Sequence, residues 1–216
     1  MNRNQLKFLG RLIAAVLLAT VLSACFVGCS SQPPALEEVR DRFIQLFEDS
    51  YEINDIFFGE GLPTLDRDDE ENRIIYYGFF GYDAYEIVQG DCPYQSVEQI
   101  KAAAEKVYSP DYLDDIYTMA FDGYADENSD QISTARYLYA EDYFLKYSFG
   151  ENDSFNILPG KRLYKYETMV IGELSSAKAV NLKIESYLEG DEQNVTTETV
   201  RFVLVDGEWY LDEPTY

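Results

Sequence analysis

Apolar side chains recur at intervals of three and four between residues 36 and 58, and this period predicts one long amphipathic helix. The period is interrupted once, around Tyr51, so the helix is either straight or kinked at that point. Residues 59–63 contain two glycines and a proline, so the hydrogen bonds of the helix are expected to end there. The apolar positions of this helix are Leu36, Val39, Phe43, Leu46, Phe47, Ile53, Ile56 and Phe57.

Two shorter helices are expected further along the chain. Ser96 and Gln99 have the spacing of a capping box, in which Ser96 caps the helix and Gln99 reaches back. Ser109 precedes Pro110, a residue favoured at the first helical position, and the helix that follows is expected to end near Phe121. Helices of this length are marginal alone, so each needs another element on which to bury its apolar face.

Period-two alternation and turn residues predict strands, most of them in the second half of the chain. Polar and apolar residues alternate most regularly over residues 179–185, which predicts one solvent-exposed face and one buried face. Asp206-Gly207 is a strong signal for a two-residue hairpin. The other expected strands cover residues 74–77, 85–88, 136–139, 143–149, 163–172, 197–205 and 209–211.

This order of elements predicts an α+β fold, in which N-terminal helices pack on a C-terminal antiparallel sheet. The sheet is expected to be a meander of four or five strands, and a cystatin-like roll is one form that it can take. Strand and helix do not alternate along the chain, so a parallel doubly wound sheet is disfavoured. The length of residues 36–216 fits a single domain.

The start of the chain has the pattern of an export signal. A basic beginning leads into an apolar run over residues 12–22, which is short for a membrane span. The run ends in Leu22-Ser23-Ala24-Cys25, which resembles the lipobox of bacterial lipoproteins, where the cysteine receives diacylglycerol and becomes the mature N-terminus. Cys29 is the alternative, preceded by a weaker match.

The lipobox resemblance divides the chain into a signal peptide (residues 1–24), a lipidated tether (residues 25–35) and a folded domain (residues 36–216). Two or more acyl chains suffice for stable anchoring, whereas a single chain binds a bilayer only marginally. The lipid bilayer is therefore an expected partner through acylated Cys25. The expected location of the domain is the extracytoplasmic face of the cell membrane.

The composition argues against several classes of partner and of catalytic site. Lys and Arg number 17, Asp and Glu number 40, and the formal net charge is −23. Removal of Arg3, Lys7 and Arg11 with the signal would bring the charge to −26. Such a charge argues against nucleic acid as a partner, because phosphate backbones bind clustered Lys and Arg. The chain has no His, which excludes Ser-His and Cys-His catalysis and His-ligated zinc.

Candidate sites are few. An acidic run holds Asp66, Asp68, Asp69, Glu70 and Glu71, but it lacks the glycine and the final glutamate that an EF-hand requires at fixed positions. A solvated acidic loop is the favoured interpretation, and we expect neither a metal nor a cofactor. Cys92 has no histidine to activate it, so a structural or free thiol is expected rather than a nucleophile.

Much of the folded part resembles a known family. The resemblance is carried by the helix end at residues 54–63, by the capped helices over residues 96–112, and by the ending over residues 202–216, where Asp206-Gly207 precedes Trp209. These segments look like small exported proteins grouped with the IseA inhibitors of DL-endopeptidases. The resemblance implies a non-enzymatic protein that binds a cell-wall cysteine peptidase of the NlpC type and blocks its cleft.

No inhibitory loop can be matched residue by residue to that family, and the acidic run at residues 66–71 is a candidate binding segment by charge only. The alternative function is a cystatin-like or nuclear-transport-factor-like module, whose helices and curved sheet enclose a small ligand at the cell surface. An enzyme is the least favoured class, because no activated nucleophile or credible metal set is found in the sequence.

Overall fold

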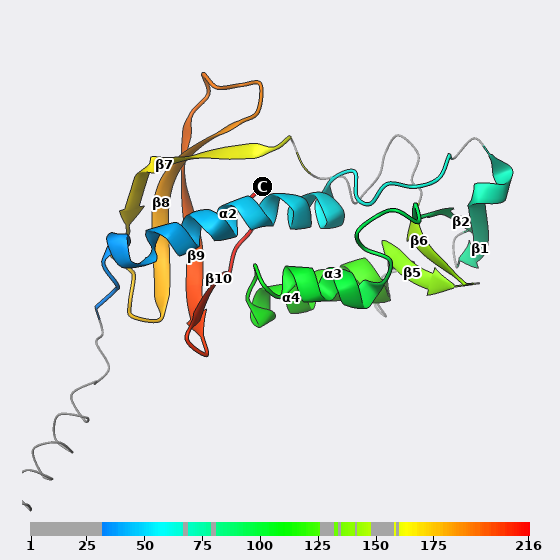
Figure 1. Cartoon of the computed structure of the whole chain (residues 1–216), viewed down its shortest axis with the longest axis horizontal. Coiled ribbons are helices and arrows are strands. Elements are labelled where there is room, and N and C mark those ends of the chain that lie inside the picture. Colours follow the sequence, from blue (N-terminus) through cyan, green and yellow to red (C-terminus); the bar gives the residue numbers. More distant parts are fainter. Residues whose placement is uncertain are drawn as a thin grey trace, which may run out of the picture.

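The computed structural model describes residues 32–66, 69–78, 81–125, 132–133, 135–140, 142–147, 158 and 160–216. The long helix α2 runs along the molecule, and the two larger antiparallel sheets lie toward its two ends (Figure 1). The elements are α2 (Leu36–Phe58), η1 (Glu70–Asn72), β1 (Arg73–Gly78), β2 (Gly81–Ile87), α3 (Val97–Ala104), α4 (Pro110–Tyr117), η2 (Thr118–Asp122), β3 (Tyr124–Ala125), β4 (Ile132–Ser133), β5 (Tyr137–Ala140), β6 (Tyr143–Tyr147), β7 (Arg162–Ile171), β8 (Ala179–Leu188), β9 (Thr196–Val205) and β10 (Glu208–Leu211).

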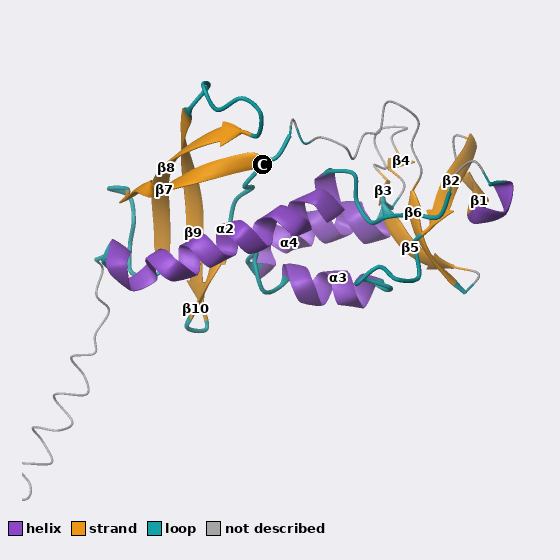
Figure 2. Cartoon of the chain, turned by 45° about the horizontal axis from the view of Figure 1, so that its top comes forward, coloured by secondary structure: helices purple, strands orange, loops and turns teal. Residues whose placement is uncertain are grey.

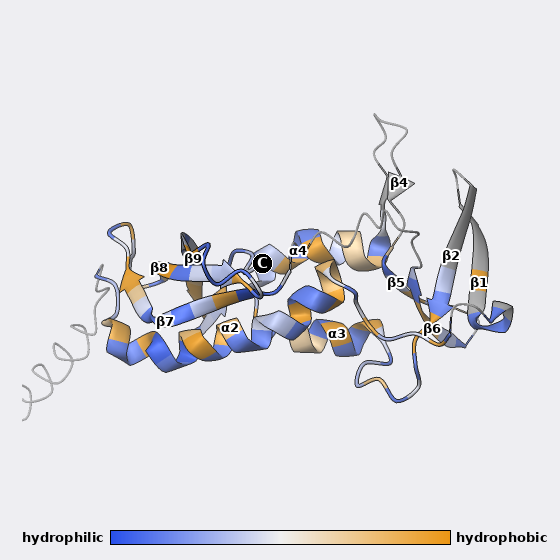
Figure 3. Ribbon diagram, turned by 90° about the horizontal axis from the view of Figure 1, so that it is seen from above, coloured by the Kyte–Doolittle hydropathy of each residue, from blue (hydrophilic) through white to orange (hydrophobic). Residues whose placement is uncertain are grey.

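Helix α2 continues without interruption through the break in its apolar pattern near Tyr51. At the break, the buried face of the helix is occupied by Ser50 and Asn54, which are 0% and 3% exposed. Hydrophobic and hydrophilic residues alternate along the ribbon of α2, as an amphipathic helix requires (Figure 3). The interruption therefore marks two buried polar side chains within one continuous helix.

The first half of α2 packs on a sheet with the strand order β10-β9-β8-β7, in which all neighbours are antiparallel. The rings of Phe43 and Phe202 are stacked with their centroids 3.8 Å apart, and Trp209 meets Phe43 edge-on at 5.5 Å. Phe47 contacts Tyr164 at 4.3 Å. Full burial of such a side chain stabilises the fold by about 2 kcal/mol. The predicted α+β fold with a C-terminal antiparallel meander is confirmed.

The hairpin between β9 and β10 also forms as the sequence predicts. Val205 pairs with Glu208 across the turn, so that Asp206 and Gly207 are its two central residues. Both residues have positive φ, 51° and 92°, which suits the twist of an antiparallel hairpin with a two-residue loop.

A separate sheet, with the strand order β1-β2-β6-β5, lies beyond the other end of α2 (Figure 2). Strand β6 pairs with β2 through Tyr85↔Tyr147 and Ile87↔Leu145. The prediction of one meander through the second half of the chain was therefore wrong for β5 and β6. The chain crosses from one sheet to the other after β6, and the tyrosine-rich pattern of these strands did not indicate which neighbour they pair with.

The caps of the short helices follow the prediction with one difference. The Ser96 hydroxyl accepts a hydrogen bond from the amide of Gln99, and the Ser109 hydroxyl accepts one from the amide of Tyr112. The side chain of Gln99 accepts from the amide of Gln95, at 2.6 Å, rather than from that of Ser96. Helix α4 is followed directly by the π-helical turn η2, so helical backbone continues to Asp122, in agreement with the predicted end near Phe121.

The end of α2 is capped by two side chains, those of Arg136, which directly precedes β5, and of Tyr137, the first residue of β5. Arg136 is 2% exposed, and its Nε and Nη2 donate to the carbonyls of Ile56 and Gly59 at 2.9 and 2.5 Å. The Tyr137 hydroxyl donates to the same Ile56 carbonyl at 2.9 Å. A cation at a helix C-terminus satisfies carbonyls that lack partners and complements the helix dipole. These bonds join α2 to β5.

In the part of the chain that the structure describes, no helix has both the length and the apolar character needed to cross a membrane.

Candidate functional site

The acidic run lies at the end of the molecule that carries β1, far from the first residue of α2 (Figure 1). Asp66, Asp69 and Glu71 are exposed. Glu70 is the first residue of the 3-10 turn η1, which leads into β1. Asp68 and the lipidation candidates Cys25 and Cys29 lie outside the described residues.

Hydrogen bonds link the described residues of the acidic run, 66 and 69–72, to one another. The amide of Glu71 donates to Oδ1 of Asp69 at 3.0 Å, and Nδ2 of Asn72 donates to the carbonyl of Asp66 at 3.0 Å. The amide of Asn72 donates to the carbonyl of Asp69, also at 3.0 Å. We call residues 66 and 69–72 the acidic turn. The carboxylates of Asp66, Asp69 and Glu71 are exposed on it.

Within the described ranges, no group of three or more Cys, Asp and Glu side chains is arranged to hold a metal ion. Asp66, Asp69 and Glu71 place negative charges on the exposed surface of the acidic turn. Such charges can attract a basic protein surface, and their effect is chiefly on the rate of encounter.

A pocket of about 570 Å³ lies where α2 leaves the β7–β10 sheet. It is lined by the last turns of α2, the start of β7 and the C-terminal segment. Between α2 and the sheet itself, the space is filled by rings such as Phe43, Phe47 and Phe202. A ligand would therefore bind at the edge of this layer and not within it. The volume is in the range of small-molecule sites.

Buried hydrogen bonds fix the floor of the pocket. Asn54 donates from Nδ2 to Oγ1 of Thr215 at 2.7 Å, and the hydroxyl of Tyr108 donates to Oδ1 of Asn54 at 2.5 Å. Thr215 in turn donates to Oγ of Ser50 at 2.8 Å. We call Ser50, Asn54, Tyr108 and Thr215 the buried polar network. It joins α2 to the loop before α4 and to the C-terminal segment, so the floor is rigid before any ligand arrives.

The Asn54→Ala variant should lose about 2 kcal/mol of unfolding free energy, because Tyr108 and Thr215 would each be left short of a buried partner. Urea denaturation measures this loss. Asn194→Ala is the control, since Asn194 donates only to Asp191 on an exposed turn, and it should change the free energy by less than about 0.5 kcal/mol. Equal losses in the two variants would contradict the role given to the network.

Burial raises the pKa of Tyr108 and of Tyr137 above the ordinary tyrosine value of 10.0. A raised pKa in the folded state means that the unfolded chain loses its protons first as the pH increases. The stabilisation is therefore complete below about pH 10 and is lost progressively above it. Urea denaturation across that range should show a constant unfolding free energy up to about pH 9 and a decline beyond pH 10. Ionisation of these two tyrosines at their ordinary pKa in the folded protein would contradict this expectation.

The two walls of the pocket carry opposite charges. Glu52 and Asp55 extend from α2, and Glu60 follows the helix. Lys161 and Arg162 come from the start of β7. Arg162 already has an ion-pair partner within the sheet, since its Nη1 lies 3.2 Å from Oε1 of Glu198. The remaining cation of the wall is therefore Lys161.

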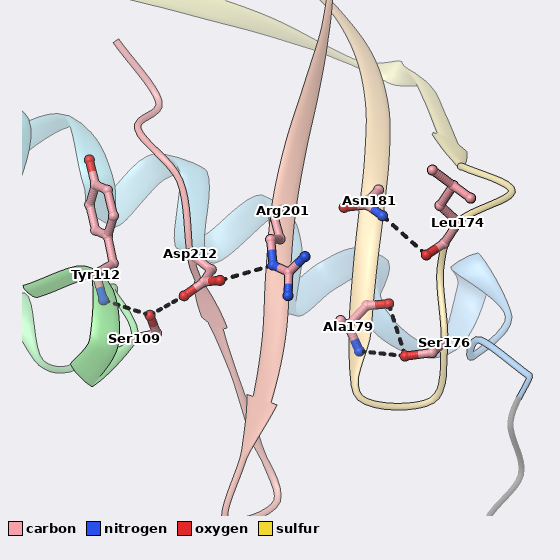
Figure 4. A network of polar contacts seen from close by, with 8 residues as sticks. All are labelled: Ser109, Tyr112, Leu174, Ser176, Ala179, Asn181, Arg201 and Asp212. Carbon is pink, nitrogen blue, oxygen red and sulfur yellow. Dashed lines mark hydrogen bonds and ion pairs between the residues drawn. The ribbon is translucent and has the colours of Figure 1, made fainter.

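Ser109, Asp212 and Arg201 form a chain of polar contacts beside the start of α4 (Figure 4). The Ser109 hydroxyl donates to Oδ1 of Asp212, and Nε of Arg201 donates to Oδ2 of the same carboxylate at 2.9 Å. The hydroxyl also caps α4 by accepting from the amide of Tyr112 at 3.2 Å. These contacts attach α4 to the end of β10. The three side chains therefore have a structural role.

Cys92 is a free thiol, and its side chain is buried at 7% exposure. It packs in the hydrophobic core. A free thiol in such surroundings behaves as a small hydrophobic side chain.

Sequence reasoning did not find the pocket. Its floor and walls come from residues far apart in the chain, such as Asn54, Lys161 and Thr215. The one available signal was the break in the apolar period of α2, which coincides with Ser50 and Asn54. A break on the buried face of a strongly amphipathic helix indicates polar residues that need partners elsewhere.

Comparison with known proteins adds no family: neither the models of known protein families nor the curated proteins include a match to this chain.

Proposed function

We propose that this protein is a non-enzymatic lipoprotein, tethered to the extracytoplasmic face of the cell membrane, that binds and restrains a peptidoglycan DL-endopeptidase of the NlpC cysteine type. The resemblance to the IseA inhibitors supports the class of partner. The observation that carries the proposal is the exposed acidic turn, residues 66 and 69–72, at the end of the molecule opposite the start of α2.

The position of the acidic turn suits a tethered inhibitor. Helix α2 has 23 residues and therefore spans about 35 Å. The tether over residues 25–35 leads into the start of this helix, on the side of the β7–β10 sheet. With Cys25 in the bilayer, α2 can hold the acidic turn away from the membrane, where a wall enzyme would meet it.

Charge explains how the turn would act. A domain with an excess of acidic residues attracts a basic enzyme surface over a distance of about 10 Å at moderate salt. Charges at the rim of an interface alter mainly the association rate and its dependence on salt. The hydrogen bonds among residues 66 and 69–72 reduce the entropy that binding would cost.

An inhibition assay against NlpC-type endopeptidases tests the proposal. The unmodified protein should inhibit at micromolar concentration, and the Asp66→Lys/Glu71→Lys double variant should associate about tenfold more slowly at low salt. Glu173→Lys/Glu192→Lys is the matched control, because it makes the same charge change at exposed positions of the C-terminal sheet hairpins. No inhibition by the folded, unmodified protein would reject the proposal. Equal rates for the two double variants would remove the acidic turn from it.

A second candidate function is a module that binds a small ligand at the cell surface. The pocket of about 570 Å³, with its rigid polar floor, favours this alternative. The two functions use different parts of the molecule, and one chain can have both. A rise in melting temperature with added small molecules, lost in variants of the pocket, tests the second function.

A further inference from the structure

We infer that the pocket at the end of α2 binds a small zwitterion that carries a free ammonium and a free carboxylate, the chemistry of an amino acid or a short peptide. The inference rests on the second proposed function and specifies its ligand. It follows from the separation of charge across the pocket.

The α2 wall would receive the ammonium. Glu52 and Asp55 are three residues apart and so share one face of the helix, and both side chains are exposed toward solvent. Oδ1 of Asp55 accepts from the amide of Glu60 at 3.2 Å, which orients this carboxylate while leaving it further acceptor capacity. Tyr216 adds an aromatic ring to the lining, and a cation is favoured against such a ring.

The β7 wall would receive the carboxylate. Nζ of Lys161 lies 4.3 Å from the centroid of the Tyr51 ring, a contact that positions the ammonium and leaves its hydrogen-bond donors for another group. In the described part of the chain, no ion pair joins Lys161 to a carboxylate of the facing wall. A ligand with both charges could bridge the two walls.

The floor favours a polar ligand of defined shape. Asn54 and Thr215 line the pocket and are held by the buried polar network. The Tyr216 ring lies against Phe58, with the centroids 4.6 Å apart, and so has a fixed partner within the protein. Preorganised groups of this kind lower the entropy cost of binding.

Calorimetric titration of the full-length protein in detergent tests the inference with alanyl-alanine, its N-acetyl derivative and its C-terminal amide. The free dipeptide should bind at millimolar concentration or below, and each derivative should bind roughly tenfold more weakly. Lys161→Met should abolish the preference for the free carboxylate. Asp55→Asn should reduce the preference for the free amine. Lys178→Met and Glu173→Gln, both on the exposed hairpin between β7 and β8, should keep both preferences.

Equal affinity for the three peptides, or no binding of the free dipeptide, would overturn the inference. So would preferences that survive both pocket variants. If the dipeptide fails but another small molecule raises the melting temperature, the ligand class is wrong while the second proposed function stands. Endopeptidase inhibition should be unchanged in Lys161→Met, because the pocket lies apart from the acidic turn.

Discussion

The Arg136→Met variant should lose about 3–5 kcal/mol of unfolding free energy, the largest effect expected for a single side chain of this protein. Methionine keeps much of the volume of the side chain but donates no hydrogen bond. The carbonyls of Ile56 and Gly59 would then lose their buried donors, and the C-terminus of α2 would lose a cation. Urea denaturation followed by circular dichroism measures the loss.

Arg40→Met is the control for Arg136→Met. Arg40 also donates from its guanidinium to a backbone carbonyl, that of Tyr166 at 3.3 Å, but it lies on the half-exposed face of α2. Its loss should therefore cost no more than about 1 kcal/mol. A similar cost for both variants would show that the capping of α2 by β5 is not what stabilises this junction.

The second large effect is expected for Gly61→Ala, at about 3 kcal/mol or more. Gly61 has φ of +76°, which an alanine adopts only with strain. An added methyl group would also lie 2.5 Å from the Tyr137 hydroxyl and 2.7 Å from Nη2 of Arg136. The substitution would thus displace the two side chains that cap α2. Chemical denaturation of the variant measures the effect.

Gly190→Ala separates the two contributions. Gly190 has a comparable φ of +84°, but an added methyl group there meets nothing within 4 Å. Its cost should be that of the backbone strain alone, about 1–2 kcal/mol. The difference between the two alanine variants then measures the collision at Gly61. If the two variants lose the same free energy, Gly61 is required for its backbone conformation only.

Elements that depend on residues close together in the chain follow from the local pattern. The period of α2, the Ser96 and Ser109 caps and the Asp206-Gly207 hairpin depend on residues close together in the chain, and all of them form as expected. The C-terminal meander follows because successive strands joined by short turns pair with each other. The excess of acidic residues is likewise a property of the sequence itself, whereas the export signal and the lipobox stay predictions.

Only the tertiary structure decided the partner of β6, since a strand pattern specifies its faces but not its neighbour. It also decided that Ser50 and Asn54 would be buried on the apolar face of α2, where each polar group needs a partner. Those partners, Tyr108 and Thr215, lie more than fifty residues further along the chain. The sequence alone thus determined the local elements and the charge of the acidic turn. The pocket, the capped end of α2 and the second sheet depend on contacts between distant segments, which no local pattern encodes.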